Sequence, residues 1–218
     1  MNGAPCGNDQ VTVLYDPLCG WCYGATPSLR RLAAQPGVSV RLLPTGLFAG
    51  VGARPMNDRF AAYAWASDQR IQQLTGQPFS ARYREHVLHD RQALLDSGPA
   101  TAALTAVTQT APEQELHALE AIQAARYVDG KDVTSPSVLA ELLREVGLAH
   151  AAERITRPTA ALEDAVATRT AAGRNLLAVV GARGLPTVVV TDAAGSRVVP
   201  NGLVYGRLEP LMQHVRSA

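Results

Sequence analysis

Cysteine is scarce in this sequence: its 218 residues contain three, Cys6, Cys19 and Cys22. Secreted folds held together by disulfides use many more, and an odd number leaves at least one thiol unpaired in a monomer. Charge is also nearly balanced, with 20 Lys and Arg against 19 Asp and Glu. Composition therefore argues against a disulfide scaffold, and against a basic surface for nucleic acid or acidic membranes.

Long hydrophobic runs are missing as well. No stretch approaches the roughly 18 apolar residues that predict a transmembrane helix. The first ten residues have neither the basic nor the apolar region of a secretory signal peptide. The sequence therefore predicts a cytoplasmic protein with no membrane partner, although a chain whose signal peptide had been removed would look the same.

Alanine, by contrast, is abundant, with 36 residues. Alanine is the strongest helix former, so a largely helical protein is expected. Arginine supplies 19 of the 20 basic residues, but these arginines are scattered singly and indicate no anion site. The length allows one large domain, or a domain that carries a sizeable insertion, with a substantial core.

Strand patterns occur only near the two ends of the chain. Residues 11–15 are β-branched and aromatic, residues 19–34 have helical spacing, and residues 38–42 alternate, which together predict a βαβ unit with parallel strands. From residue 55 to about 156, breakers separate four or five helices with no convincing strand between them. A helix over about 158–182, a hairpin with its turn at 192–195, and a helix over 206–215 complete the chain. We therefore predict an α/β domain in two parts, 1–49 and 158–218, with a helical subdomain inserted at 50–157.

The sharpest motif is Cys19-Gly20-Trp21-Cys22, where the first predicted strand gives way to the first helix. Unpaired N–H groups and the dipole at a helix N-terminus favour a thiolate, the attacking species in disulfide exchange. Two intervening residues place the second sulfur one turn further into the helix. We therefore predict that Cys19 is the exposed attacking thiol and Cys22 the more buried resolving thiol.

Two other interpretations of the cysteines remain open. A zinc site would need further ligands, for which Cys6 and the pair His86 and His89 are candidates, but a strand–helix junction is not required for zinc. The cysteines could also be two small buried hydrophobic residues. Asp16-Pro17 and Gly20 indicate an exposed turn, which favours a redox pair without a metal.

Two prolines strengthen the redox interpretation. Pro27 lies inside the first predicted helix, where it should cause a kink. Pro186 precedes the late strand and withholds one ladder hydrogen bond. If its peptide bond is cis, the backbone of Leu185 can face an extended peptide.

With these pieces in this order, the sequence resembles the thioredoxin superfamily, and within it the DsbA-like branch, including FrnE-like protein-disulfide isomerases. The resemblance covers nearly the whole chain and implies an α/β, thioredoxin-like fold with a large helical insertion. It also implies that Cys19 attacks, that Cys22 resolves, that Pro186 is cis and that Leu185 helps to hold the substrate. The remaining expected substrate-binding residues are neighbours of these: Gly20, Trp21 and Thr187.

The sequence departs from the family in two places. An acidic residue that often lies six positions before the first cysteine is replaced by Val13, so proton transfer from Cys22 must use water or another group, for which Asp16 is a candidate. Gly20-Trp21 replaces the Pro-His pair of the periplasmic oxidants. A strongly oxidising potential is therefore not implied, and the redox direction stays open.

The leading hypothesis is an enzyme, a protein-disulfide oxidoreductase or isomerase that forms a mixed disulfide with protein or small-molecule disulfides. It would need no cofactor beyond its own cysteine pair, with glutathione as a possible partner. One alternative is a glutathione-dependent isomerase or kappa-type transferase, although such enzymes generally lack the second cysteine. The other is a peptide- or zinc-binding module without enzymatic activity.

Overall fold

A four-stranded mixed sheet forms the centre of the molecule. The computed structural model describes residues 9–192 and 195–216. The sheet order is β2 (Val38–Pro44), β1 (Asp9–Tyr15), β5 (Thr187–Asp192) and β6 (Gly195–Val198), with β1 parallel to β2 and antiparallel to β5. The predicted βαβ unit and late hairpin are confirmed. Residues 193–194 of the expected hairpin turn lie outside the described residues.

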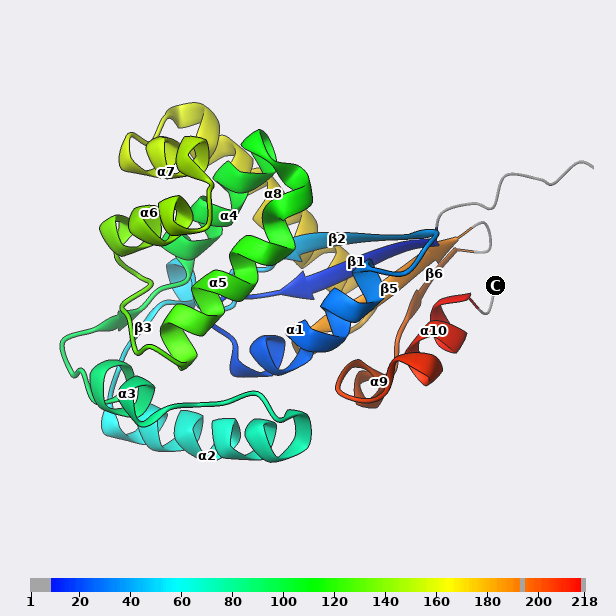
Figure 1. Cartoon of the computed structure of the whole chain (residues 1–218), viewed down its shortest axis with the longest axis horizontal. Coiled ribbons are helices and arrows are strands. Elements are labelled where there is room, and N and C mark those ends of the chain that lie inside the picture. Colours follow the sequence, from blue (N-terminus) through cyan, green and yellow to red (C-terminus); the bar gives the residue numbers. More distant parts are fainter. Residues whose placement is uncertain (1–8, 193–194, 217–218) are drawn as a thin grey trace, which may run out of the picture.

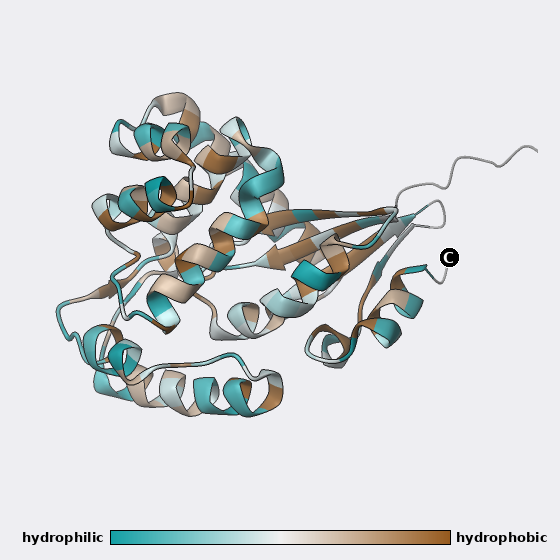
Figure 2. Cartoon of the chain, in the orientation of Figure 1, coloured by the Kyte–Doolittle hydropathy of each residue, from teal (hydrophilic) through white to brown (hydrophobic). Residues whose placement is uncertain are grey.

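Helices cover both faces of this sheet, as Figure 1 shows. Val11, Val13 and Tyr15 alternate with Leu14 along β1, as the two-residue period of a strand requires. The first three belong to the main core, shared with α1 (Gly20–Ala33) and α10 (Leu208–Arg216), whereas Leu14 packs with residues of α8 (Ala160–Val179). Figure 2 shows the resulting hydrophobic band along the strands between these helical layers.

Five helices of eight or more residues lie within the described part of the predicted helical stretch. They are α2 (Asp58–Thr75), α4 (Gly98–Thr110), α5 (Glu115–Tyr127), α6 (Pro136–Glu145) and α7 (Ala149–Thr156). Shorter helical turns are η1 (Gly50–Gly52), α3 (Ala81–Tyr83), the π-helical η2 (Arg84–Leu88) and η3 (Pro112–Gln114). The DsbA-like thioredoxin fold with a helical insertion is thus confirmed, whereas the boundaries at residues 49 and 157 stay a prediction.

One detail of the predicted elements was wrong, and one short helix was not predicted. The helical stretch contains a two-stranded ladder, β3 (Arg54–Pro55) and β4 (Leu94–Leu95), whose strands are too short to show a periodic pattern. The helix expected over 206–215 is α10, and the short helix that precedes it, α9 (Asn201–Val204), was not predicted. No described helix is long and apolar enough to span a bilayer.

Helix α1 continues through Pro27 because another part of the chain satisfies the backbone there. Proline has no N–H, so the carbonyl of Tyr23, four residues earlier, lacks its helical donor. The side chain of Gln77 donates to this oxygen instead, over 3.2 Å. Gly24 also lets α2 approach closely, because a Cβ there would lie 2.5 Å from Ile71. The chain after α2 therefore helps to hold the first helix in place.

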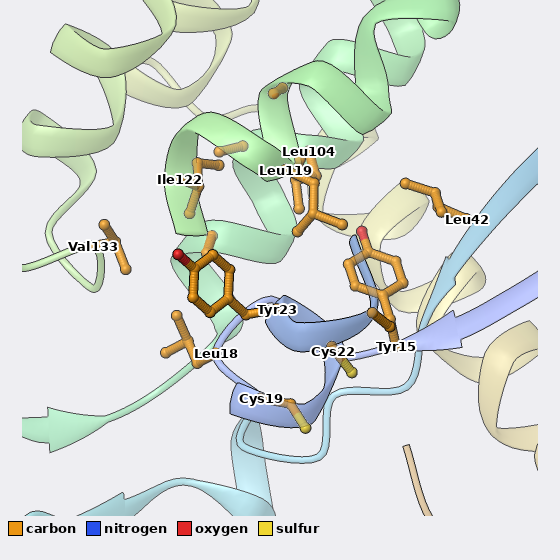
Figure 3. Close-up of a cluster of buried hydrophobic side chains, with 14 of the residues drawn as sticks. Tyr15, Leu18, Cys19, Cys22, Tyr23, Leu42, Leu104, Leu119, Ile122 and Val133 are labelled. Atoms are coloured by element: carbon orange, nitrogen blue, oxygen red, sulfur yellow. The ribbon is translucent and has the colours of Figure 1, made fainter. Parts of the chain in front are cut away.

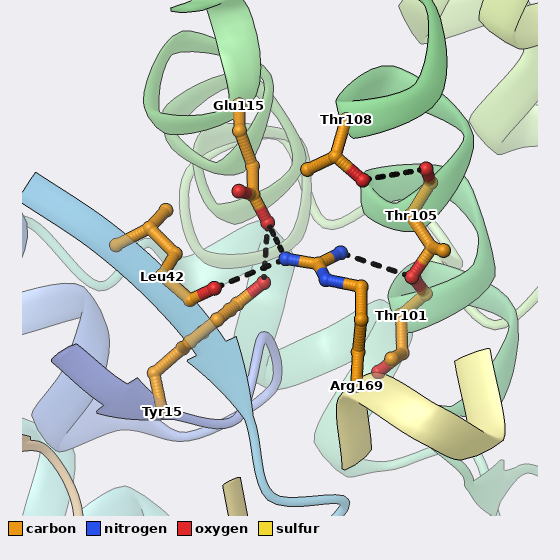
Figure 4. A network of polar contacts seen from close by, with 7 residues as sticks. All are labelled: Tyr15, Leu42, Thr101, Thr105, Thr108, Glu115 and Arg169. Carbon is orange, nitrogen blue, oxygen red and sulfur yellow. Dashed lines mark hydrogen bonds and ion pairs between the residues drawn. The ribbon is translucent and has the colours of Figure 1, made fainter. Parts of the chain in front are cut away.

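A buried polar network joins the insertion to the sheet (Figure 4). Arg169 of α8 forms an ion pair with Glu115 of α5 and donates to the Leu42 carbonyl of β2 and to Thr105 of α4. Tyr15 of β1 also donates to Glu115, over 3.5 Å. Burial raises the pKa of Glu115, and the Arg169 guanidinium counteracts that shift. The ion pair between Arg169 and Glu115 therefore connects five elements: α8, α5, α4, β2 and β1.

Replacement of Arg169 by methionine should destabilise the protein by about 3 kcal/mol or more, because Glu115 is left without its cation. Urea unfolding at pH 7 measures this change. The matched control is Lys131→Met, which removes the exposed pair with Glu145 and should cost less than about 1 kcal/mol. Equal losses in the two variants would contradict a structural role for the buried pair.

Candidate active site

The two motif cysteines lie at the start of α1, as predicted. Cys19 is the N-cap residue, with extended backbone angles, and α1 begins at Gly20. Figure 3 shows Cys22 one turn further along, nearer to Tyr15. Both thiols are free, and the exposed fraction is 8% for Cys19 and 2% for Cys22. The more accessible sulfur is thus the one at the helix N-terminus, where an attacking thiolate is favoured.

The environment of Cys22 favours its protonated form. Burial raises the pKa of Cys22 well above its usual range, and a hydrogen bond and charge interaction with Cys19 raise it further. A backbone hydrogen bond from Asp16 acts in the opposite direction, while the negative charge of Asp16 adds to the increase. Cys22 is therefore a thiol at neutral pH in the reduced protein, and it has to lose a proton before it can attack.

Asp16 fixes the turn that leads into the cysteines. Its Oδ1 accepts from the Leu18 N–H over 2.9 Å, and its Oδ2 accepts from the Phe48 N–H over 3.1 Å and the Ser97 hydroxyl over 2.7 Å. Burial raises the pKa of Asp16, and these hydrogen bonds oppose the increase. The candidate proton acceptor thus lies close to Cys22, but its function in proton transfer stays a prediction.

A cavity of about 380 Å³ opens beside Cys19. It is lined by the first residues of α1, by α2, by the end of α5, and by Gly184 and Leu185 before β5. Most of the exposed lining is apolar. The volume is at the small end of the range typical of small-molecule sites, about 300–1,000 Å³. The helical insertion therefore forms one wall of the site rather than a separate body.

Three polar side chains of the insertion form a chain of contacts in this cavity. Tyr83 donates to Asp68 over 3.0 Å, and the Arg126 guanidinium lies over the Tyr83 ring, 5.6 Å from its centre. Burial raises the pKa of Asp68 to about 7, a shift that Tyr83 and Arg126 oppose. Gly20 lets this carboxyl reach α1, because a Cβ there would lie 2.4 Å from the Asp68 Oδ1. A titratable acid therefore lies against the residue that follows Cys19.

The predicted substrate-binding residues are not all equally accessible. Gly20, Trp21 and Leu185 line the cavity with Cys19. The Leu185–Pro186 bond is cis, which confirms that expectation. Pro186 is buried, and Thr187 is buried with its hydroxyl donating to the Gly184 carbonyl over 2.7 Å. The binding role of all five residues stays a prediction.

Sequence reasoning did not identify Asp68, Tyr83 or Arg126 as site residues. A signal for two of them was nevertheless present. Asp68 lies three residues before the buried Ile71 in α2, and Arg126 lies four residues after the buried Ile122 in α5. Residues at these spacings share a helix face, so each charge interrupts an apolar stripe. Such a charge indicates a buried polar partner or a ligand.

The zinc hypothesis gains no support from the described residues. Within residues 9–192 and 195–216, no three His, Cys, Asp or Glu side chains gather as a metal site would require. His86 and His89 lie in and just after η2 and do not join the cysteines. Cys6, the third cysteine, lies outside the described residues.

Comparison with known proteins identifies the family. Residues 10–204 match the model of the DSBA-like thioredoxin domain, and the chain belongs to this family. Membership carries thiol–disulfide oxidoreductase activity as the class of the protein. Among curated proteins, none matches the chain.

Solved structures agree with this assignment. The cytosolic disulfide reductase DsbM from Pseudomonas aeruginosa is 34% identical, with a TM-score of 0.84 over 96% of this chain and 100% of that one. The same reductase solved with GSH is 33% identical, with a TM-score of 0.82 over 95% and 99%. A candidate protein disulfide isomerase from Nitrosomonas europaea, at 24% identity and a TM-score of 0.77 over 95% of each chain, shows the shared fold alone.

The two thiols should differ in their reaction with iodoacetamide. In a reduced Cys6→Ser background at pH 7, Cys19 should be alkylated first, because the buried Cys22 remains protonated. In the Cys19→Ser variant, Cys22 should react slowly at pH 7 and faster as the pH is raised, because burial raises its pKa. Peptide mass mapping measures both reactions, with urea-unfolded protein as the control in which both cysteines react. Equal rates in the native protein would contradict the assignment.

Asp68 should make stability depend on pH. The folded protein holds this proton up to about pH 7, whereas the unfolded chain loses it near pH 3.8, so the folded state binds more protons between these values. The stability of the wild type relative to Asp68→Asn should therefore fall by roughly 2–4 kcal/mol as pH rises from 4 to 7, and then level off. Urea unfolding at several pH values measures the difference, and a constant difference would refute the prediction.

Proposed function

We propose that this protein is a cytoplasmic disulfide reductase that uses the Cys19–Cys22 pair and takes its electrons from glutathione. One observation carries the proposal: a free thiol at a helix N-terminus borders a small cavity, with a second, protonated thiol buried one turn behind it. The likeness to DsbM, a cytosolic disulfide reductase also solved with GSH, supports the direction, the partner and the compartment.

The reaction proceeds by two exchanges. The Cys19 thiolate attacks one sulfur of the substrate disulfide, so a Cys19–substrate disulfide forms and one substrate thiolate leaves. Cys22 then loses its proton and attacks the Cys19 sulfur, which releases the second substrate thiol and forms the Cys19–Cys22 disulfide. Two electrons and two protons pass to the substrate.

Glutathione restores the dithiol. One glutathione thiolate attacks the Cys19 sulfur, giving a Cys19–glutathione disulfide and the Cys22 thiol. A second glutathione thiolate attacks the glutathione sulfur, which releases oxidised glutathione and the Cys19 thiolate. Two glutathione molecules thus become one disulfide, and no other reductant is needed.

Three neighbouring groups support these steps. Leu185 and the first two residues of α1, Gly20 and Trp21, line the cavity where the substrate disulfide would lie. Asp16, which acts on the pKa of Cys22 from close by, is the candidate acceptor of its proton in place of the absent acid at Val13. Each is inferred from position and burial.

Cysteine variants test the proposal. With glutathione and a small disulfide such as 2-hydroxyethyl disulfide, Cys19→Ser should lower turnover at least a hundredfold, because the attacking sulfur is gone. Cys22→Ser should accumulate a mixed disulfide between Cys19 and glutathione, which intact mass spectrometry detects. Cys6→Ser is the matched control and should retain wild-type turnover.

Two outcomes would count against this function. Retention of more than a tenth of the activity in Cys19→Ser would show that the reaction does not pass through that sulfur. Tight glutathione binding without oxidation of the cysteine pair across a glutathione redox series would favour the transferase-like alternative. A two-proton mass difference confined to Cys19 and Cys22 is the result expected of a redox pair.

A further inference from the structure

The cavity beside Cys19 contains a buried cation without a direct counter-ion. Arg126, at the end of α5, is only 3% exposed, and its guanidinium lies 5.6 Å from the centre of the Tyr83 ring and 5.7 Å from that of Tyr127. No carboxylate in the described part of the chain forms an ion pair with it. Its Nε also lacks a hydrogen-bond acceptor among those residues. Burying a guanidinium in this way is unfavourable unless an anion completes its interactions.

The acidic groups around Arg126 do not fill that place. The Arg126 charge lowers the pKa of Asp68 and of Asp16 at a distance, but Asp68 accepts from the Tyr83 hydroxyl and forms no ion pair with the arginine among the described residues. Asp68 is also only partly ionised at neutral pH, because its pKa is about 7. The two oxygens of Asp16 accept from other groups. An anion that enters the cavity therefore meets an arginine whose hydrogen-bonding capacity is not used up.

We propose that Arg126 binds a carboxylate of the low-molecular-weight thiol that reacts at Cys19, and so selects anionic thiols over neutral ones. This inference rests on the proposed function, since it concerns the thiol that reduces the Cys19–Cys22 disulfide. Glutathione fits the site in two respects: it carries two carboxylates on a short peptide, and the cavity of about 380 Å³ has the size of a small-molecule site. A guanidinium is suited to carboxylates because its N–H groups match the two oxygens.

Arg126 and the reacting cysteines belong to different parts of the chain. It lines the same cavity as Cys19, but it belongs to the insertion, whereas the cysteines belong to α1. Tyr127, the next residue, donates to the Leu18 carbonyl over 2.7 Å, so the end of α5 is fixed to the residue before Cys19. The arginine is therefore held at a set position relative to the reacting sulfur. Arg126 is a binding residue that determines which thiol is used.

The test compares glutathione with its uncharged-carboxyl analogue, glutathione diethyl ester. The rate at which each thiol reduces the Cys19–Cys22 disulfide of the full chain is measured by intact mass after alkylation. Each rate is divided by the rate of the same thiol with 2-hydroxyethyl disulfide in solution, which removes differences in intrinsic reactivity. The wild type should prefer glutathione by roughly tenfold or more, the range expected for a charge-assisted hydrogen bond.

Variants then locate the preference. Arg126→Gln should bring the ratio of the two rates close to one, and Arg126→Lys should keep part of the preference. Arg157→Gln is the matched control: Arg157 is exposed and does not line this cavity, so its loss should leave the ratio as in the wild type.

The outcomes distinguish this inference from the proposed function. If neither thiol reduces the Cys19–Cys22 disulfide of the wild type, the proposed function itself fails. If both thiols reduce it equally well, the function stands and the carboxylate site is wrong, a conclusion that needs no variant to fold. A preference that survives in Arg126→Gln, or one that disappears in Arg157→Gln, also overturns the assignment to Arg126.

Discussion

The buried carboxylate of Asp16 is the interaction on which the arrangement of the site depends. Within the described chain it ties three segments together: the turn before α1 through Leu18, the loop after β2 through Phe48, and the start of α4 through Ser97. A carboxylate with four lone-pair sites can accept from several donors at once, which no other small side chain does as well. Since Asp16 lies directly between β1 and the cysteines, the same contacts that join the insertion to the sheet also place Cys19 at the helix N-terminus. The cost of burying the charge appears as the raised pKa of this carboxyl.

This arrangement explains how a DsbA-like site can operate with valine at position 13. Val13 is buried in the core between β2 and β5, opposite Leu42 and Val188. Asp16 instead approaches Cys22 from the strand end, where a backbone hydrogen bond from Asp16 lowers the pKa of that thiol and the charge of Asp16 raises it. The thiol pair is thus asymmetric, with Cys19 in the cavity wall and Cys22 behind it, for reasons of burial as well as helix position. On the proposed function, Cys19 is therefore the sulfur that would meet a substrate.

How much the sequence could predict depends on the range of the interactions concerned. The βαβ unit, the late hairpin and the placement of the two cysteines follow from patterns within about 30 residues, and all were predicted. The β3–β4 ladder was missed because strands of two residues, pairing Arg54 with Leu95 and Pro55 with Leu94, carry no period. Arg126 was missed for a different reason: it becomes a candidate site residue only because it packs on Tyr83 and lines the cavity with Cys19, and both residues lie far from it in the sequence. A charge in an apolar helical stripe is visible in sequence, but the side chains around it are known only from the fold.

The insertion therefore does more than cover the sheet, because it determines the electrostatics of the cavity beside the thiols. Without Arg126, the exposed Arg54 would be the one cation left among the described residues that line the cavity, beside the Asp68 carboxyl and the hydroxyls of Tyr83 and Tyr127. With Arg126, the positive charge lies across Tyr83 from an acid that is half protonated near neutral pH. The net charge facing a ligand is then positive at pH 7 and less so above it, as Asp68 ionises. On this proposal, the insertion selects the thiol and α1 carries the reacting sulfurs. The two parts are in contact at Gly20, where the absence of a side chain lets Asp68 of α2 reach α1.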